Sequence, residues 1–311
     1  MSAPLSLDQR ILYTYVAMQS LAHGRALNDI AEEVGVSRFA ASRMVKKARE
    51  IGLVEVRAST QEPVDVDLSQ RLARRFGMRS AVVVSCASRR EEDIRDAIAG
   101  VAAGFLQEHA NDDDLIGLAP GRTMVALSRR VTQLPWMDVV QITGVGAPRL
   151  EDGVEAIVNI ARASGGASYP LYTPIVVEQA EQALIVKHPS HQRTIRRFDH
   201  LTKVFLTIGG WPSSSLLAQQ LADLGEMETL VAQGVVAEIG TVLLDDQGNS
   251  VHSLRNRIIG ISEEQLRAVD MRVAVGGGPG KEGALGAILR SGIPNHVITD
   301  TRSAISALMG D

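Results

Sequence analysis

The amino-terminal part of the chain contains the stretch that decides its fold, Leu27-Asn-Asp-Ile-Ala-Glu-Glu-Val-Gly-Val-Ser-Arg-Phe-Ala-Ala-Ser-Arg-Met-Val-Lys-Lys-Ala-Arg-Glu-Ile-Gly52. Gly35 suits the left-handed backbone that ends a helix, and Ser37 is a residue type that caps the start of the next one. The apolar residues before Gly35 lie on one helical face, at Leu27, Ile30, Ala31 and Val34. The stretch therefore predicts two helices joined by a short turn, a helix-turn-helix.

The second of these helices has a basic face opposite its predicted buried stripe. Ser37–Arg49 holds five positive charges and no negative one. Arg and Lys side chains reach phosphates and guanine edges when such a helix lies in the major groove of DNA. A solvated helix face without a DNA partner is the alternative. The residues that we predict to contact DNA are Ser37, Arg38, Phe39, Ser42, Arg43, Lys46, Lys47 and Arg49.

The flanking sequence completes a small domain over residues 1–57. Gly52 ends the basic helix, and the alternation in Leu53–Arg57 predicts a short strand, typical of a wing beside a recognition helix. Upstream, a first helix is predicted from the apolar residues Leu7, Ile11, Leu12, Tyr15, Val16 and Leu21. We therefore expect an all-α, winged helix-turn-helix domain that binds operator DNA.

The charge of the whole chain hides this basic segment. The 311 residues carry a net charge of −4, but residues 1–60 hold eight Lys or Arg against six Asp or Glu. So small a positive charge supplies few phosphate contacts, which favours a homodimer or homotetramer on a repeated site. The single cysteine excludes an internal disulfide framework, and neither a signal peptide nor a transmembrane span is recognisable, so we expect a cytoplasmic protein.

Residues 58–67 are polar and contain Pro63, which predicts a linker. Residues 68–311 then alternate short apolar runs with helical segments, and this order predicts a mainly parallel sheet with helices on both faces. We expect a Rossmann-like α/β effector domain. The predicted strands are Ala81–Val84, Leu115–Leu118, Val139–Ile142, Val204–Ile208, Arg272–Val275 and His296–Thr299.

Four of the predicted strands end in glycine-rich segments. In parallel sheets, ligands bind at the carboxyl ends of strands, where loops lead into helix amino termini. One such glycine commonly serves turn geometry alone, but four of them favour an anionic small molecule when polar residues stand at the adjoining helix starts. These residues are Arg122, Thr123, Ser213, Ser214 and Lys281. The segments are Gly117–Thr123, Gly144–Gly146, Gly209–Ser215 and Gly276–Lys281, and we include Gly144, Gly210, Ser213, Gly277 and Gly278 in the predicted effector site.

Nucleotide and metal sites are not indicated. A phosphate-binding loop of the Walker A type requires glycine where Val275 stands and Ser or Thr where Glu282 stands. Gly144-Val-Gly146 lacks the third glycine of a dinucleotide fingerprint. The seven histidines are scattered, and Asp112–Asp114 lacks the remaining spacing of a cation loop. We therefore expect no cofactor and no metal.

The chain as a whole resembles the SorC family of bacterial sugar-binding transcriptional regulators. The resemblance spans nearly the full length and rests on a series of short motifs in a fixed order. They are Ile30–Arg38, Lys46–Val54, Gly121-Arg-Thr123, Val139–Gly144, Thr173-Pro174, Glu238–Gly248, Gly276–Lys281 and Val297–Asp300.

This resemblance implies an effector domain related to sugar-phosphate isomerases of the glucosamine-phosphate deaminase type. It also implies that a phosphorylated sugar alters the affinity of a dimer or tetramer for its operator. Carried onto this sequence, Gly121, Arg122 and Thr123 hold phosphate, Lys281 contacts phosphate or sugar oxygens, and Glu238 accepts sugar hydroxyls.

The alternative is a sugar-phosphate isomerase or aldolase-like enzyme fused to a DNA-binding module. In that case Lys281 would form a Schiff base, and catalysis would need an acid or base beside it. Glu282 and Glu238 are the candidates linked to the motifs. We expect a receptor rather than an enzyme.

Overall fold

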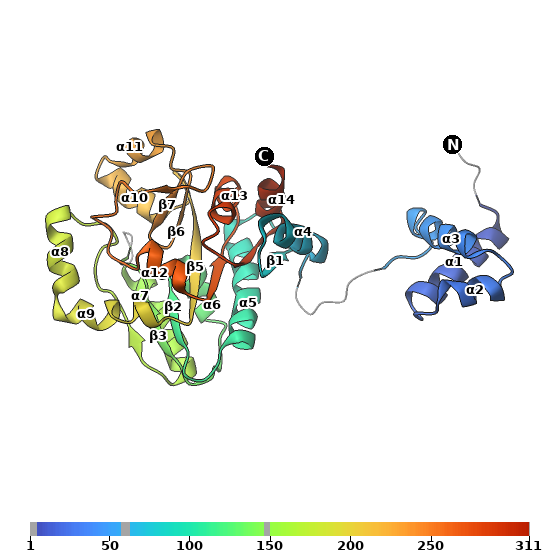
Figure 1. Ribbon diagram of the computed structural model, residues 1–311, viewed down its shortest axis with the longest axis horizontal. Coiled ribbons are helices and arrows are strands. Elements are labelled where there is room, and N and C mark those ends of the chain that lie inside the picture. Colours follow the sequence, from blue (N-terminus) through green and yellow to red (C-terminus); the bar gives the residue numbers. More distant parts are fainter. Residues whose placement is uncertain (1–4, 57–62, 146–149, 311) are drawn as a thin grey trace. The chain divides into compact units, whose positions relative to one another are not determined.

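The computed structural model describes residues 5–56, 63–145 and 150–310, without the side chains of residues 150–153. The chain divides into two compact units, Met1–Thr60 and Gln61–Asp311 (Figure 1). Each unit has its own apolar core. No helix in the described parts of the chain is long and apolar enough to cross a bilayer.

The first unit consists of three helices in its described residues: α1 (Leu7–Leu21), α2 (Leu27–Glu33) and α3 (Arg38–Glu50). Gly35 adopts a φ of 71° between α2 and α3. The Ser37 hydroxyl caps α3 by accepting a hydrogen bond from the Ala40 backbone N–H at 3.2 Å. The predicted helices and the break between them are confirmed. Their shared core is formed by Val16, Ile30, Ala31 and Ala41.

The strand predicted at Leu53–Arg57 is wrong for its described residues, and Arg57 lies outside them. The segment after Gly52 forms turns without any strand, and residues 5–56 contain no strand at all. Leu53 instead donates its backbone N–H to the Ala48 carbonyl at 2.8 Å, which closes the end of α3. An alternating pattern forms a strand only when another strand is present to accept and donate hydrogen bonds.

The second unit is built on a parallel sheet with the strand order β1-β10-β9-β5-β2-β3-β4. All six predicted strands are present within one or two residues of their predicted bounds. The bounds are β1 (Ser80–Val84), β2 (Leu115–Leu118), β3 (Asp138–Gln141), β4 (Ser168–Tyr169), β5 (Lys203–Gly210), β9 (Met271–Val275) and β10 (His296–Asp300).

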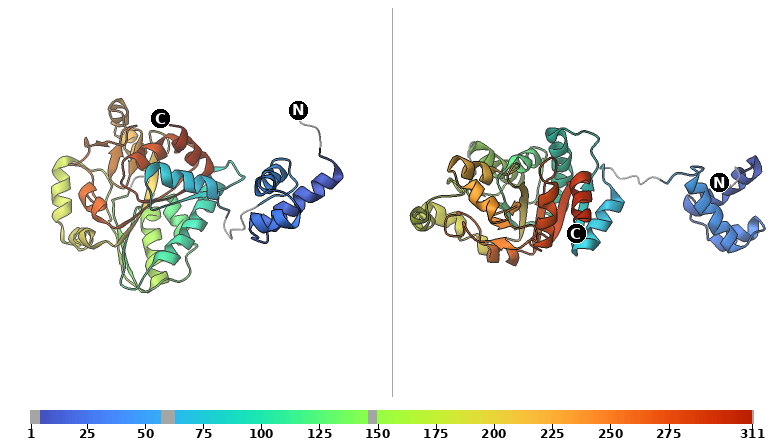
Figure 2. Two further views of the ribbon diagram at one scale, coloured as in Figure 1. Left: turned by 45° about the vertical axis from the view of Figure 1, so that its right-hand side comes forward. Right: turned by 90° about the horizontal axis from the view of Figure 1, so that it is seen from above.

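Helices cover both faces of this sheet (Figures 1 and 2). Along β5, Val204, Leu206 and Ile208 join one core layer, while Phe205 joins the other. The first layer packs under α4 (Val66–Phe76), α13 (Glu282–Arg290) and α14 (Thr301–Met309), and the second under α5 (Glu91–His109), α6 (Arg122–Ser128) and α7 (Leu150–Ser164). The remaining helices are α8 (Gln179–Lys187), α9 (Pro189–Ile195), η1 (Phe198–His200), α10 (Leu216–Asp223), α11 (Met227–Ala232) and α12 (Glu263–Ala268).

A short antiparallel extension was not predicted from the sequence. It comprises β6 (Ala237–Ile239), β7 (Val242–Leu244) and β8 (Ser250–Val251), runs too short to show a clear alternation. Strand β6 pairs with the carboxyl end of β5, with Glu238 opposite Gly209. This pairing brings Glu238 to the edge of the sheet where the glycine-rich loops begin.

The predicted linker at residues 58–67 is too long at its carboxyl end. Val64 forms an antiparallel bridge with Val84, and the Asp65 backbone N–H donates to the Val83 carbonyl at 2.8 Å. The Asp65 carboxylate then caps α4 by accepting from the Leu68 backbone N–H at 2.9 Å. Residues 63–67 therefore belong to the second unit, because β1 offers free backbone groups that this segment can pair with. Residues 58–62 lie outside the described residues.

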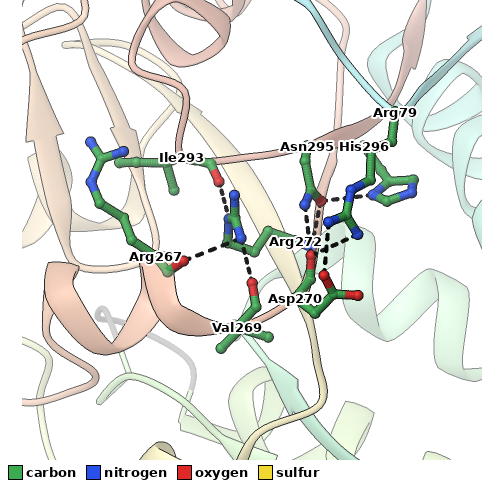
Figure 3. A network of polar contacts seen from close by, with 8 residues as sticks. All are labelled: Arg79, Arg267, Val269, Asp270, Arg272, Ile293, Asn295 and His296. Atoms are coloured by element: carbon green, nitrogen blue, oxygen red, sulfur yellow. Dashed lines mark hydrogen bonds and ion pairs between the residues drawn. The ribbon is translucent and has the colours of Figure 1, made fainter.

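A polar network joins the amino ends of β1, β9 and β10 (Figure 3). Arg79 donates to the Asp270 carboxylate at 2.8 Å, and Asn295 accepts from the Arg272 backbone N–H at 2.9 Å. Burial, followed by the charge of Arg79, lowers the pKa of His296 to about 4. The Arg272 guanidinium donates to the backbone carbonyls of Arg267, Val269 and Ile293.

Candidate functional site

The carboxyl ends of β2, β3, β5 and β9 surround a cleft of about 820 Å³, including the space at its mouth. This position agrees with the general rule for ligand sites in parallel sheets. Seven of the ten residues predicted for the effector site line the cleft. They are Gly121, Arg122, Thr123, Gly144, Glu238, Gly277 and Lys281.

The other three predicted residues, Gly210, Ser213 and Gly278, do not line it. A side chain at Gly210 would come within 1.9 Å of the Gly280 carbonyl oxygen, so this glycine allows two loops to approach each other closely. The Ser213 hydroxyl lies beside Gly280. Gly278 lines a separate depression that also includes Cys86. These residues shape the loops around the cleft.

Several lining residues were missed by sequence reasoning. Glu91 and Arg95 come from the first turns of α5, which follows β1, and no glycine-rich motif marks them. The only sequence signal for these two residues was their position, four residues apart at the start of a helix that follows a strand. Polar residues of the lining that were also not predicted are Thr143, Thr207, Ser215 and Gln219.

Lys281 is a half-buried cation of the cleft lining. It precedes α13 as its N-cap, and its ammonium makes no hydrogen bond or ion pair within the described part of the chain. Although the residue as a whole is only half-buried, desolvation, followed by the charge of Arg122, lowers the pKa of Lys281 to about 8. An ammonium that has lost water without gaining a partner favours an incoming anion.

Glu238 faces the same cleft with one oxygen already used. Its Oε2 atom accepts hydrogen bonds from Trp211 Nε1 and from the Ser215 hydroxyl, both at 2.8 Å. The Oε1 atom has no hydrogen-bond partner among the described residues. Burial raises the pKa of Glu238, and its hydrogen bonds and Lys281 only partly oppose that rise. The free oxygen can accept a hydrogen bond from a ligand hydroxyl.

The two arginines of the cleft share one carboxylate. Glu91 Oε1 lies 3.0 Å from Arg122 Nη2 and 3.4 Å from Arg95 Nη1. The Arg95 side chain is 18% exposed, whereas those of Arg122 and Glu91 are 51% and 42% exposed. The positive charge of Arg122, for which the family resemblance implies a role in phosphate binding, is thus paired within the chain.

The predicted DNA-contacting residues all lie on α3 or at its N-cap. Seven of the eight are exposed, Lys47 is half-buried, and Phe39 is 81% exposed. Lys46 and Lys47 lie 3.9 and 3.7 Å from Glu50. Within residues 5–56, the other basic side chains of this face make no ion pair. They are Arg38, Arg43 and Arg49.

A protein-family model described as "Putative sugar-binding domain" matches residues 63–309. The match begins at Pro63, which agrees with the start of the second unit as the backbone pairing of Val64 defines it. The cleft and all ten predicted effector residues fall inside the matched range.

Two curated relatives align with most of the chain. "Uncharacterized transcriptional regulator YjhU" of Escherichia coli (strain K12) is 26% identical over 293 residues, 90% of this chain and 89% of that protein. "Deoxyribonucleoside regulator" of Bacillus subtilis (strain 168) is 27% identical over 289 residues, 91% of this chain and 92% of that protein.

Among solved structures, the full-length sorbitol operon regulator SorC from Klebsiella pneumoniae has a TM-score of 0.71 and 22% sequence identity. The likeness covers 97% of this chain and 99% of that one, so it includes both units. At this identity it shows a common fold.

Proposed function

Because the chain belongs to the sugar-binding-domain family of SorC-type transcriptional regulators, we propose that it is a transcriptional regulator controlled by a carbohydrate effector bound in the cleft. The observation that carries this proposal is the unpartnered, desolvated ammonium of Lys281 in a cleft that also holds a free oxygen of Glu238. A cation and a hydrogen-bond acceptor side by side suit a ligand that carries both an anionic group and hydroxyls.

The effector of this proposal is a phosphorylated sugar. Lys281 and Arg122 would contact the phosphate, with Gly121 and Thr123 at the same strand end, while Glu238 would accept a hydrogen bond from a sugar hydroxyl. Charge-assisted hydrogen bonds of this kind are about twice as strong as neutral ones, so they dominate the choice of ligand. The relation of this domain to sugar-phosphate isomerases is part of the proposal and is supported by the cleft at the carboxyl edge of the parallel sheet.

A thermal-shift titration of the full chain with a panel of sugar phosphates and the matching free sugars tests the effector site. We expect stabilisation by phosphorylated members that is lost in Lys281→Ala and reduced in Arg122→Ala. Lys187→Ala is the matched control, because Lys187 is an exposed lysine of α8 outside the cleft. Equal responses of Lys281→Ala and wild type would remove the proposed site.

The DNA-binding part of the proposal rests on the first unit. Helices α2 and α3, joined at Gly35, would form a helix-turn-helix that places the exposed face of α3 in the major groove. With the wing strand absent in residues 53–56, α3 would supply most base contacts. The modest positive charge of this unit supports binding of operator DNA by a homodimer or homotetramer.

A DNA-binding assay tests this interface with a site selected from a random duplex library. Arg43→Ala and Lys46→Ala are each expected to weaken binding and to reduce the salt slope by about one. Arg10→Ala is the control, because Arg10 is an exposed arginine of α1 rather than α3. Full affinity and an unchanged salt slope in the α3 variants would show that another surface reads the DNA.

A second candidate function, sugar-phosphate isomerase or aldolase-like chemistry, is favoured by one observation. A pKa of about 8 leaves part of Lys281 as the free amine near neutral pH, as a Schiff-base lysine requires. Borohydride reduction in the presence of carbonyl-bearing sugar phosphates, followed by mass spectrometry, distinguishes the two functions. A receptor gives no covalent adduct at Lys281, whereas an enzyme of this type gives one.

A further inference from the structure

One carboxylate already stands at the anion-binding end of the cleft. Glu91 contacts Arg122 at 3.0 Å and Arg95 at 3.4 Å through the same oxygen, and its charge also acts on Lys281 by raising the pKa of that lysine. The Glu91 carboxylate therefore interacts with three cations of the lining, Arg95, Arg122 and Lys281. An anionic group of a bound ligand would interact with the same three side chains.

The cleft lining contains more positively than negatively charged side chains. Arg95, Arg122 and Lys281 are opposed by two carboxylates, Glu91 and Glu238. Glu238 is held through Oε2 by Trp211 and Ser215, and no arginine of the described residues forms an ion pair with it. Glu91 is thus the carboxylate paired with both arginines of the cleft.

The Glu91 side chain is free to leave this position at low cost. It is 42% exposed, so its carboxylate can turn toward water and recover hydration when Arg122 binds something else. Ion pairs at such exposure contribute little net free energy. A ligand with one negative charge that reaches Arg122 would therefore gain about the same interaction free energy with this arginine as Glu91 loses.

We propose that Glu91 is an internal competitor for the anionic group of the effector, and that this competition makes the cleft select a doubly charged phosphate over a singly charged carboxylate. A carboxylate that displaces Glu91 exchanges one negative charge for another, while a phosphate dianion adds a charge next to Arg95, Arg122 and Lys281. The inference rests on the proposed effector site and adds the residue that determines its charge specificity.

Isothermal titration of the full chain at pH 7 with inorganic phosphate and with gluconate tests this role. Glu91→Gln is expected to bind phosphate about two- to fivefold more tightly than wild type, which is the range for losing one partly exposed ion pair. Gluconate binding should improve by a larger factor, so the preference for phosphate narrows. Glu92→Gln is the matched control and should leave both affinities unchanged, because Glu92 pairs with Arg90 outside the cleft.

The pH dependence of phosphate binding provides a second measurement, which would not change if the role of Glu91 were purely structural. The groups that act on Lys281 are Arg122, Arg95, Glu91 and Glu238, and of these the two carboxylates hold its pKa up. In Glu91→Gln the pKa of Lys281 should fall, so the loss of phosphate binding on the alkaline side should begin at lower pH. If Glu91→Gln does not fold, Glu91→Asp shortens the side chain and tests the same contact.

Phosphate binding by Glu91→Gln that is equal to or weaker than wild type, with Lys281→Ala abolishing it, would overturn the competitor role alone. Phosphate binding that does not depend on Lys281 would overturn the proposed effector site and, with it, any competition at that site. Tighter binding in Glu91→Gln but not in Glu92→Gln supports both.

Discussion

At the amino edge of the sheet the Arg272 guanidinium donates to three backbone carbonyls, whereas at the carboxyl edge the Lys281 ammonium has no partner among the described residues. Asp270 shows the same contrast with Glu238, since Arg79 pairs with the first while the second keeps one oxygen free. The charged groups of the amino edge, which are the half-buried Arg272 and the exposed pair Arg79 and Asp270, all have partners within the chain. Lys281 and one oxygen of Glu238 have no hydrogen-bond partner among the described residues, and this difference is the reason why we propose that the effector binds at the carboxyl edge.

The largest effect is expected from breaking the amino edge. Arg272→Ala removes hydrogen bonds to the carbonyls of Arg267, Val269 and Ile293, which join the segments before β9 and β10. We expect the free energy of unfolding to fall by about 3 kcal/mol. Urea denaturation of the full chain measures this loss. A variant as stable as wild type would mean that the network is dispensable.

Lys281→Ala should lower the affinity for the effector without lowering the stability of the fold. It removes an ammonium whose desolvation outweighs the attraction of Glu91 and Glu238, so the free energy of unfolding should stay the same or rise. Affinity for an anionic effector should fall by about thirtyfold, the loss of about 2 kcal/mol for a hydrogen bond to a charged group. Denaturation and titration of the same preparation separate the two results. A large loss of stability would contradict a ligand-binding role.

Acid should act on the amino edge. The pKa of His296 in the folded chain is about 4, below its ordinary value of 6.5, because burial disfavours the imidazolium. The unfolded chain therefore binds the proton first, and stability is lost as the pH falls from about 6.5 toward 4, by up to about 3 kcal/mol. His296→Gln should flatten this limb of a stability profile. An unchanged limb would assign the acid sensitivity to other groups.

Alkali should act on the carboxyl edge instead. Lys281 loses its proton as the pH rises through about 8, and the neutral amine no longer attracts an anion. Affinity for a sugar phosphate should then fall by up to about tenfold per pH unit above that value. Lys281→Arg retains the charge and should remove the dependence. Affinity that stays constant to pH 9.5 in wild type would contradict the low pKa.

Much of the fold is predictable from local pattern. The six predicted strands and the helices around Gly35 are where their sequences place them, because periodic burial and helix capping depend on residues close in the chain. The prediction of a wing strand at Leu53 was wrong because the backbone N–H of Leu53 donates to the end of α3 and not to another strand. Strand β6 was missed because a run of three residues has no readable period.

The sequence by itself determined the two helices on either side of Gly35, the alternating α/β order and the glycine-rich strand ends, since each depends on preferences of neighbouring residues. Only the tertiary structure decided which charged side chains have a partner within the chain and which do not. Glu91 and Arg122 are distant in sequence, and their ion pair exists because α5 and α6, which they begin, pack against each other. The same geometry leaves Lys281 without a partner, because pairing depends on distances between segments that no local pattern records.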